Sequence, residues 1–279
     1  MEHISYSWQR LRANKFAMGG LFILCLLVIL AIIGPAFSPY AYYETHLSWK
    51  NLPPSLEHPF GTDELGRSLF VRIWWGARIS LFIGVAAAII DMIIGVFYGG
   101  IAGMIGGKVE EMMMRLLDML HSLPHLLIVI LLTVIMEQGI LTILIAMTLT
   151  GWINMARIVR AQILSLKEQD FITAARSIGA SPMRILIRHL IPNCFGAIIT
   201  TMTLTIPHAI FTEAFLSFLG LGVQAPIASW GTMASDGLPA LSFYPWRLFF
   251  PAAFISITML AFNLLGDGMR DAFDPRLRR

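Results

Sequence analysis

Six stretches of this chain are apolar and nearly free of charged residues, and they alternate with more polar segments. The first stretch is 18 residues long. At a rise of about 1.5 Å per residue it spans roughly 27 Å, enough to cross a thin bilayer. The stretches are too long for buried core helices, and none shows the short alternating pattern of membrane β-strands. The pattern predicts an all-α, polytopic membrane protein with six transmembrane helices, over residues 16–33, 79–105, 116–136, 140–156, 194–218 and 248–265.

The Lys and Arg residues predict the orientation of these helices. Fifteen of the 20 fall on the side of the N-terminus, and because basic residues favour the cytoplasmic side, we expect both termini to be cytoplasmic. The first stretch is longer than the core of a signal peptide, so we expect a retained anchor. The expected organisation is a cytoplasmic segment over 1–15, a first helix and outer segment over 16–78, a membrane core over 79–265 with a cytoplasmic loop at 157–193 and an outer loop at 219–247, and a cytoplasmic tail over 266–279.

The composition agrees with a membrane protein and excludes several other classes. The chain is 57% hydrophobic and 13% charged, whereas soluble proteins average about 25% charged residues. Too few charges are present to cover a soluble protein of this size, and disorder is excluded for the same reason. The net charge of +3 is small for a nucleic-acid-binding protein. We expect Cys25 and Cys194 to be reduced packing residues.

The outer segment changes character at Asp63. Several prolines before it favour an extended path, whereas apolar residues after it recur at helical spacing. Asp63 and Arg67 are four residues apart and could pair, and Trp74 and Trp75 suit a membrane–water interface. Two interpretations stay open, an interfacial helix that anchors the second span and an outer gate or docking element for an external partner.

The cytoplasmic loop over 157–193 contains two short amphipathic helices. The pattern predicts one helix over 165–178, a break at Gly179, and a second helix with Ser181 as its N-cap and an end at Pro192. Such a basic loop could lie on anionic lipid, but its small residues favour docking of another protein. In the outer loop, the sequence predicts a short helix over 230–236 that is capped by Ser229.

A few polar residues lie within the apolar stretches. Asp91 falls mid-membrane, where a carboxylate either faces a cavity or forms a hydrogen bond at a helix contact, and both interpretations stay open. Glu213 is predicted nearer the outer end, where hydration is easier, and Pro207 predicts a kink next to His208.

Residues 102–109 lack the phosphate-loop pattern, and His121 with His125 supplies only two metal ligands, so we expect no catalytic or metal site.

The non-membrane segments resemble the permeases of ABC importers. Residues 170–193 are similar to the coupling loop of that family, with Thr173 where the family usually has Glu. Residues 61–81, 213–222, 229–231 and 263–268 resemble the peptide/nickel branch, and within it the C-type subunit of oligopeptide permeases. The positions that carry the resemblance are Ala174, Ala175, Gly179, Arg184, His189 and Pro192 in the loop, and Gly61, Thr62, Asp63, Gly66, Arg67, Arg72, Gly76, Arg78, Ser80 and Leu81 in the outer segment.

This resemblance implies a type I ABC importer permease in the bacterial inner membrane. It implies a second homologous permease subunit, two ABC ATPase subunits that bind ATP and Mg²⁺, and an external solute-binding protein that delivers peptide, with no enzyme activity or cofactor in this chain. The expected roles are ATPase coupling for Asp170, Thr173, Ala174, Ala175, Gly179, Arg184, His189 and Pro192, an outer gate or docking element for Gly61, Thr62, Asp63, Gly66, Arg67, Arg72 and Arg78, and the pathway for Asp91, His208 and Glu213.

Three alternatives remain at this point. A permease of the same branch could carry nickel chelates or glutathione. A proton-coupled secondary transporter would instead depend on Asp91 and Glu213, and it would not need a docking loop. A membrane enzyme is disfavoured because no catalytic motif is present.

Overall fold

The computed structural model describes residues 2–273, and nearly all of their regular structure is helical. Short 3₁₀ turns lie at Gly34–Phe37, Leu47–Trp49 and Leu238–Ala240, and one isolated bridge joins Thr62 to Ser68. The helices are α1 (Glu2–Ala13), α2 (Lys15–Ile33), α3 (Leu69–Ile105), α4 (Gly107–Ser122), α5 (His125–Ile135), α6 (Ile140–Gly151), α7 (Ile153–Lys167), α8 (Asp170–Ser177), α9 (Pro182–Ile185), α10 (Ile191–Asn193), α11 (Phe195–Phe218), α12 (Trp230–Gly237) and α13 (Trp246–Phe273).

The prediction of an all-α membrane protein is confirmed, but the third predicted span is not one helix. By length and composition, five helices in the described part of the chain can cross a membrane, and α4 with α5 makes a sixth if the bent pair is one span. These two helices meet at an angle of 74°. Pro124 explains the bend, because proline disfavours the helical conformation of the residue before it, and Leu123 is extended at ψ 133°.

The second and fourth spans are longer than the sequence predicted. Helix α3 begins at Leu69 rather than at residue 79 and has 37 residues, so it is about 56 Å long. The helix predicted after Asp63 begins at Leu69 and continues without a break into the second predicted span, so no separate helix ends at residue 78. Trp74 is buried against Phe254. The helical structure of the fourth candidate span continues as far as Lys167, so residues 157–167 are helical instead of forming a loop.

Helix α3 lies at the centre of the bundle and packs on α2, α7 and α11. Its Gly95, Gly99 and Gly103 face α7, where a Cβ atom at Gly99 would overlap the carbonyl oxygen of Ala156. Small residues at this spacing allow two helix backbones to approach closely. The glycine stripe is therefore a packing contact within this chain.

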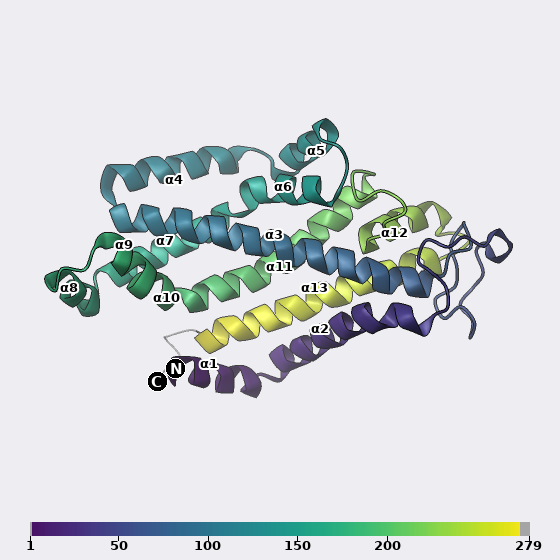
Figure 1. Cartoon of the computed structure of the whole chain (residues 1–279), viewed down its shortest axis with the longest axis horizontal. Coiled ribbons are helices and arrows are strands. Elements are labelled where there is room, and N and C mark those ends of the chain that lie inside the picture. Colours follow the sequence, from purple (N-terminus) through teal and green to yellow (C-terminus); the bar gives the residue numbers. More distant parts are fainter. Residues whose placement is uncertain (1, 274–279) are drawn as a thin grey trace.

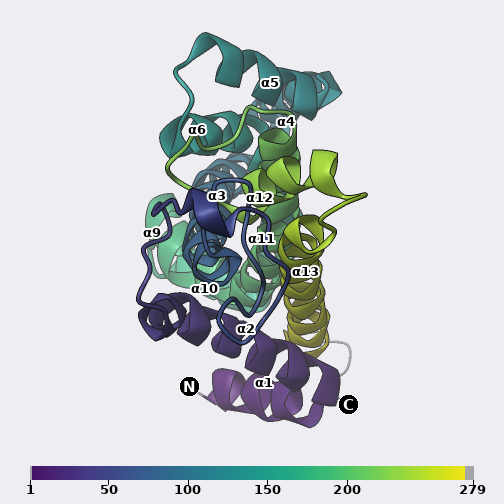
Figure 2. The same ribbon diagram turned by 90° about the vertical axis from the view of Figure 1, so that its right-hand side faces the viewer.

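The long helices run side by side, so the connecting segments gather at two opposite ends of the bundle (Figure 1). Helices α8 and α9 lie at one end, together with α1 and the last turns of α13. The segment between α2 and α3 lies at the opposite end, next to α12, as Figure 2 also shows. The N-terminal helix thus shares an end with the predicted cytoplasmic loop. Arg276, Arg278 and Arg279, which contributed to the predicted orientation, lie outside the described residues.

Candidate functional site

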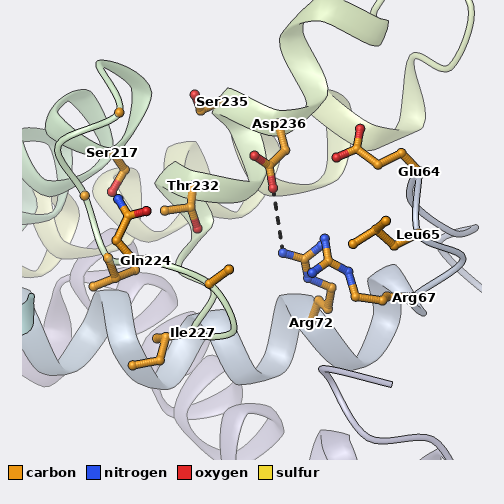
Figure 3. Close-up of a pocket in the computed structure, with 14 residues that line it drawn as sticks. Glu64, Leu65, Arg67, Arg72, Ser217, Gln224, Ile227, Thr232, Ser235 and Asp236 are labelled. Carbon is orange, nitrogen blue, oxygen red and sulfur yellow. Dashed lines mark ion pairs between the residues drawn. The ribbon is translucent and has the colours of Figure 1, made fainter. Parts of the chain in front are cut away.

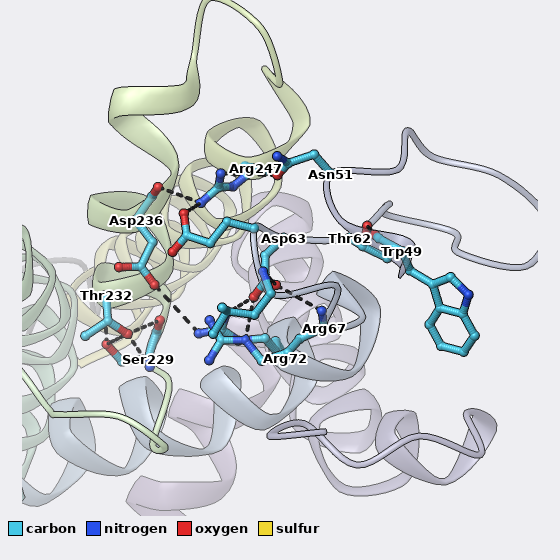
Figure 4. Close-up of polar contacts among 12 residues, drawn as sticks. Trp49, Asn51, Thr62, Asp63, Arg67, Arg72, Ser229, Thr232, Asp236 and Arg247 are labelled. Carbon is cyan, nitrogen blue, oxygen red and sulfur yellow. Dashed lines mark hydrogen bonds and ion pairs between the residues drawn. The ribbon is translucent and has the colours of Figure 1, made fainter. Parts of the chain in front are cut away.

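A cluster of charged side chains surrounds Asp63 at the N-terminal end of α3, the end predicted to be the outer one (Figure 4). Asp63 Oδ1 accepts hydrogen bonds from the backbone N–H groups of Leu65 and Arg67, both at 2.9 Å. Its other oxygen accepts a hydrogen bond from Arg67 Nε at 2.7 Å and one from Arg72 Nη1. The predicted pairing of Asp63 with Arg67 is confirmed, and Arg72 joins the same carboxylate from the first turn of α3.

The cluster extends to the predicted outer loop over 219–247 through residues that the sequence analysis missed. Arg72 Nη2 lies 3.8 Å from Asp236 of α12, and Arg247 of α13 donates to Glu64 at 2.6 Å. Arg247 also donates to the backbone oxygen of Asp236 at 3.0 Å. The contacts of Arg72 with Asp236 and of Arg247 with Glu64 join positions more than 150 residues apart, for which a local sequence pattern carries no signal. They tie α12 to the beginning of α3.

The charges of the cluster alter the pKa values of its carboxyl groups. Burial by itself would raise the pKa of Asp63, but the guanidinium groups of Arg72 and Arg67 and the hydrogen bonds from Arg67 lower it below the usual range. The pKa of Asp236 is raised by burial, which outweighs the attraction of Arg72. The cluster therefore favours the charged form of Asp63, whereas burial disfavours the charged form of Asp236.

Two glycines and Thr62 shape the turn that presents Asp63. Gly61 and Gly66 have φ values of +76° and +72°, which disfavour other residues. A Cβ atom at Gly66 would also overlap the carbonyl oxygen of His46. Thr62 Oγ1 accepts a hydrogen bond from the backbone of Leu52 at 2.8 Å and fastens the turn to the preceding loop.

Arg78, which was predicted to share an outer gate or docking element with Asp63, Arg67 and Arg72, does not belong to this cluster. Its guanidinium donates to the carbonyl oxygens of Ala31 at 2.6 Å and Ile32 at 2.8 Å, at the end of α2. It also lies over the ring of Trp75, 4.7 Å from the centroid. A cation at this position satisfies carbonyl groups that the helix leaves open, so Arg78 caps α2.

A pocket of about 360 Å³ opens between α12, the start of α3 and the loop after α11 (Figure 3). Arg67, Arg72 and Asp236 line one side of it, and Gln224 and Ile227 line the other. Arg72 Nε is buried and has no hydrogen-bond partner among residues 2–273. The pocket therefore lies directly against the cluster that joins the outer segments.

The predicted coupling segment forms two short helices at the other end of the molecule. Helix α7 ends at Lys167 and α8 begins at Asp170, so the single helix predicted over 165–178 is interrupted at Gln169, which is extended at ψ 148°. The break at Gly179 is confirmed, with φ +81° and open space around its Cα atom. Ser181 accepts a hydrogen bond from the N–H of Arg184 at 3.4 Å, so the predicted cap of α9 is also confirmed.

Helix α8 has one inward and one outward face. Ile172 and Ala175 are buried in a cluster with Ile163 of α7 and Ile185 of α9. Thr173 and Ala174 are exposed, as is Asp170. The structure therefore separates the two alanines, because Ala175 packs within this chain and only Ala174 is free to meet another protein. Next to this face, Ile178 is 86% exposed.

The chain from α9 to α11 continues without the end that was predicted at Pro192. A π-helical turn covers Leu186–Leu190 and includes His189, and Pro192 then lies in the first turn of α10. Proline has no N–H to donate to a carbonyl four residues earlier, which favours the wider turn before it. Asn193 Nδ2 donates to the carbonyl oxygen of His189 at 2.6 Å. The segment thus links α9 to α11 by almost continuous helix.

The three predicted pathway residues have different surroundings. Glu213 is fully buried and accepts hydrogen bonds from Ser80 at 3.2 Å and Ser217 at 2.8 Å, so the prediction that it is easily hydrated is wrong. The hydroxyl of Ser80 also accepts from the N–H of Trp230 at 3.2 Å. Glu213 therefore helps to join α3, α11 and α12 instead of facing an open path.

Asp91 and His208 lie elsewhere. Asp91 is 5% exposed, and its Oδ1 has no partner in the described part of the chain. It faces Gly151, where a Cβ atom would overlap the carboxylate. His208 is exposed, with its ring 6.3 Å from that of His125. The structure does not bring these residues together with Glu213, and among the described residues no group of three potential ligands forms a metal site.

Comparison with known proteins identifies the family. Residues 95–279 match the family "Binding-protein-dependent transport system inner membrane component", and residues 4–54 match the "N-terminal TM domain of oligopeptide transport permease C". The chain belongs to this family of transport permeases, as its sequence resemblance indicated. It is a multi-pass membrane permease of the bacterial inner membrane type.

The similar proteins are permease subunits of peptide transport systems. The oligopeptide transport system permease protein OppC of Bacillus subtilis (strain 168) is 61% identical over 270 residues, which cover 97% of this chain and 88% of the relative. The dipeptide transport system permease protein DppC of the same organism is 59% identical, with 98% and 86% covered. OppC of Escherichia coli (strain K12) is 45% identical, with 97% and 92% covered.

Proposed function

We propose that this chain is a transmembrane permease subunit of an ATP-driven importer that takes up oligopeptides or dipeptides. The observation that carries the proposal is the high identity, over nearly the whole chain, to two permeases named for oligopeptide and dipeptide transport. Because the two identities are almost equal, they favour peptides as a class without favouring one length. Nickel chelates and glutathione have no comparable support.

The partners follow from the family and from the exposed surfaces of the chain. A second homologous permease subunit completes the pathway, two ATPase subunits bind ATP and Mg²⁺, and an external binding protein delivers the peptide. Exposed apolar side chains on α4 and α5, such as Met112, Met119 and Leu131, offer a surface for the second subunit or for lipid. The outward face of α8 offers a surface for an ATPase.

The geometry supports a mechanical role for the cytoplasmic segment. Closure of the ATPase dimer on ATP pushes α8 through its exposed Thr173 and Ala174. Gly179 sets the angle between α8 and α9, and the helical link from α9 carries the motion into α11. Rigid-body movement of the packed helices then alternates access to the two sides. At the outer end, the cluster around Asp63 joins the loop before α3 to α12 and lies where a binding protein would dock.

A proton-coupled secondary transporter fits the structure less well. That mechanism needs a carboxylate that exchanges protons with water, and Glu213 is fully buried and held by two serine hydroxyl groups. The ATP-driven importer is therefore the better supported function.

The test is reconstitution. The chain should copurify with a second permease and two ATPases, and proteoliposomes with all four subunits should accumulate a labelled tripeptide when the binding protein and ATP are present. Complexes that bind ATP without hydrolysing it should show no uptake. Uptake by this chain alone, without an ATPase, would contradict the proposal.

A further inference from the structure

The cytoplasmic end of α3 is held by a side chain from α7. The Lys167 ammonium donates to the carbonyl oxygens of Met104 at 2.8 Å and Gly103 at 3.1 Å. The last carbonyl groups of a helix lack partners within the helix, and the negative end of its dipole attracts a cation. Lys167 therefore caps α3 from a different helix.

Lys167 places this cap next to the predicted coupling segment. It is the last residue of α7, three positions before α8 begins at Asp170. Arg157 and Arg160, which are also on α7, pair instead with Asp118 and Glu110 of α4. Of these three cations, Lys167 is the one that bonds to α3 within the described part of the chain. The end of α7, just before α8, is thus bonded directly to α3, and the opposite end of α3 carries Arg72.

We propose that Lys167 is a positioning residue that fixes the corner before α8 to α3, so that displacement of α8 moves α3 as well as α11. This inference rests on the proposed function, in which an ATPase acts on α8. Val96 of α3 and Ile172 of α8 belong to one apolar cluster, whose packing fills space but forms no directional bond. The two hydrogen bonds from Lys167 are directional, and they fix the end of α7 against the last carbonyl groups of α3. Helix α3 then links the coupling segment to the outer cluster, because Met104 and Arg72 are 32 residues apart on it, about 48 Å along its axis.

The experiment measures the peptide imported per ATP hydrolysed by the complete reconstituted transporter. Lys167→Met keeps a long side chain but removes the donors, and we expect the ratio to fall about fivefold, a common scale for coupling between distant sites. Lys167→Arg keeps a cationic donor and should restore most of the ratio. The matched control is Lys108→Met, which removes an exposed lysine of α4 at the same end of the molecule.

A second pair of variants tests the contact from the α3 side. Gly106 and Gly107 both have positive φ values, +74° and +62°, so alanine strains the backbone at either position. A Cβ atom at Gly106 would lie 3.3 Å from Lys167 Nζ, whereas one at Gly107 would meet nothing within 4 Å. We expect Gly106→Ala to lower the ratio and Gly107→Ala to leave it near the wild-type value.

The outcomes separate this inference from the proposed function. If the wild-type complex neither hydrolyses ATP nor imports peptide, the proposed function fails. If the wild type is coupled and Lys167→Met keeps its ratio, only the role of Lys167 is overturned. Should Lys167→Met fail to assemble, the glycine pair decides, because equal ratios for the two alanine variants would overturn the inference.

Discussion

Replacement of Arg72 by methionine probes the outer cluster directly. Arg72 is 4% exposed and shares the carboxylate of Asp63 with Arg67. The change removes the guanidinium while it keeps an unbranched side chain in the first turn of α3. Asp63 would then be buried with one charged partner instead of two, and Asp236 would lose its contact to α3.

The structure sets the size of the expected loss. Removal of one partner from a buried ion pair costs about 3–5 kcal/mol. Asp63 keeps Arg67 Nε at 2.7 Å and two backbone donors at 2.9 Å, so we expect the lower end, about 3 kcal/mol. The 3.8 Å contact to the half-exposed Asp236 adds little. For chains near this size, the loss corresponds to a decrease in Tm of roughly 6–12 °C.

Thermal unfolding of the purified transporter measures this change. The control is Arg115→Met, which breaks an ion pair to Glu111 in which the two side chains are 73% and 61% exposed. That pair should contribute about 0.5 kcal/mol or less. A double-mutant cycle of Arg72→Met with Asp63→Asn then isolates the coupling between the two side chains. If Arg72→Met lowers Tm no more than Arg115→Met, the cluster does not hold the outer segments together.

Three further predictions concern the coupling segment, the membrane core and pH. Gly179→Val strains the backbone at φ +81°, so we expect ATP hydrolysis to continue while uptake falls, and normal uptake would argue against a coupling role. Gly151→Ala places a methyl group against Asp91 and should cost about 1–3 kcal/mol in thermal unfolding. Gly139→Ala meets nothing within 4 Å and should cost less, only what alanine costs at the N-cap of α6, and equal effects would rule out the contact. Because the pKa of Asp63 is lowered in the folded state, its contribution to stability is present above the unfolded value of about 3.9 and is lost as pH falls through the folded value. Unfolding curves at decreasing pH should show this loss in the wild type and lack it in Asp63→Asn, and identical profiles would refute the assignment.

The sequence predicted those features of the fold that depend on local pattern. Long apolar stretches identified the membrane helices, because only helices and closed barrels satisfy all backbone polar groups in lipid, and these stretches lack the alternation of barrel strands. Turn chemistry identified the break at Gly179 and the caps at Ser181 and Ser229, where Thr232 completes a capping box. The spacing of Asp63 and Arg67 predicted their ion pair. Each of these features depends on residues within a few positions of one another.

The features that the sequence did not predict depend on distant contacts. Hydropathy alone could not show that α3 begins at Leu69, because its first turns are buried by α12 and α13 rather than by lipid. Glu213 was expected near water, but it is buried and accepts a hydrogen bond from Ser80, which lies 133 positions away in the sequence. The partners of Arg72 and Lys167 also come from other helices. The role of an ionisable residue in such a chain is therefore best assigned once the residues that surround it in the structure are known.

Cross-linking of α8 to an ATPase subunit tests the central claim most directly. In a background of Cys25→Ala and Cys194→Ala, a single cysteine replaces either the exposed Ala174 or the buried Ala175. If the outward face of α8 is the surface that an ATPase contacts, a short cross-linker should join Ala174→Cys to the ATPase in the assembled transporter, while Ala175→Cys reacts far less. Equal reaction at the two positions, or none at Ala174→Cys in a complex that imports peptide, would contradict the account.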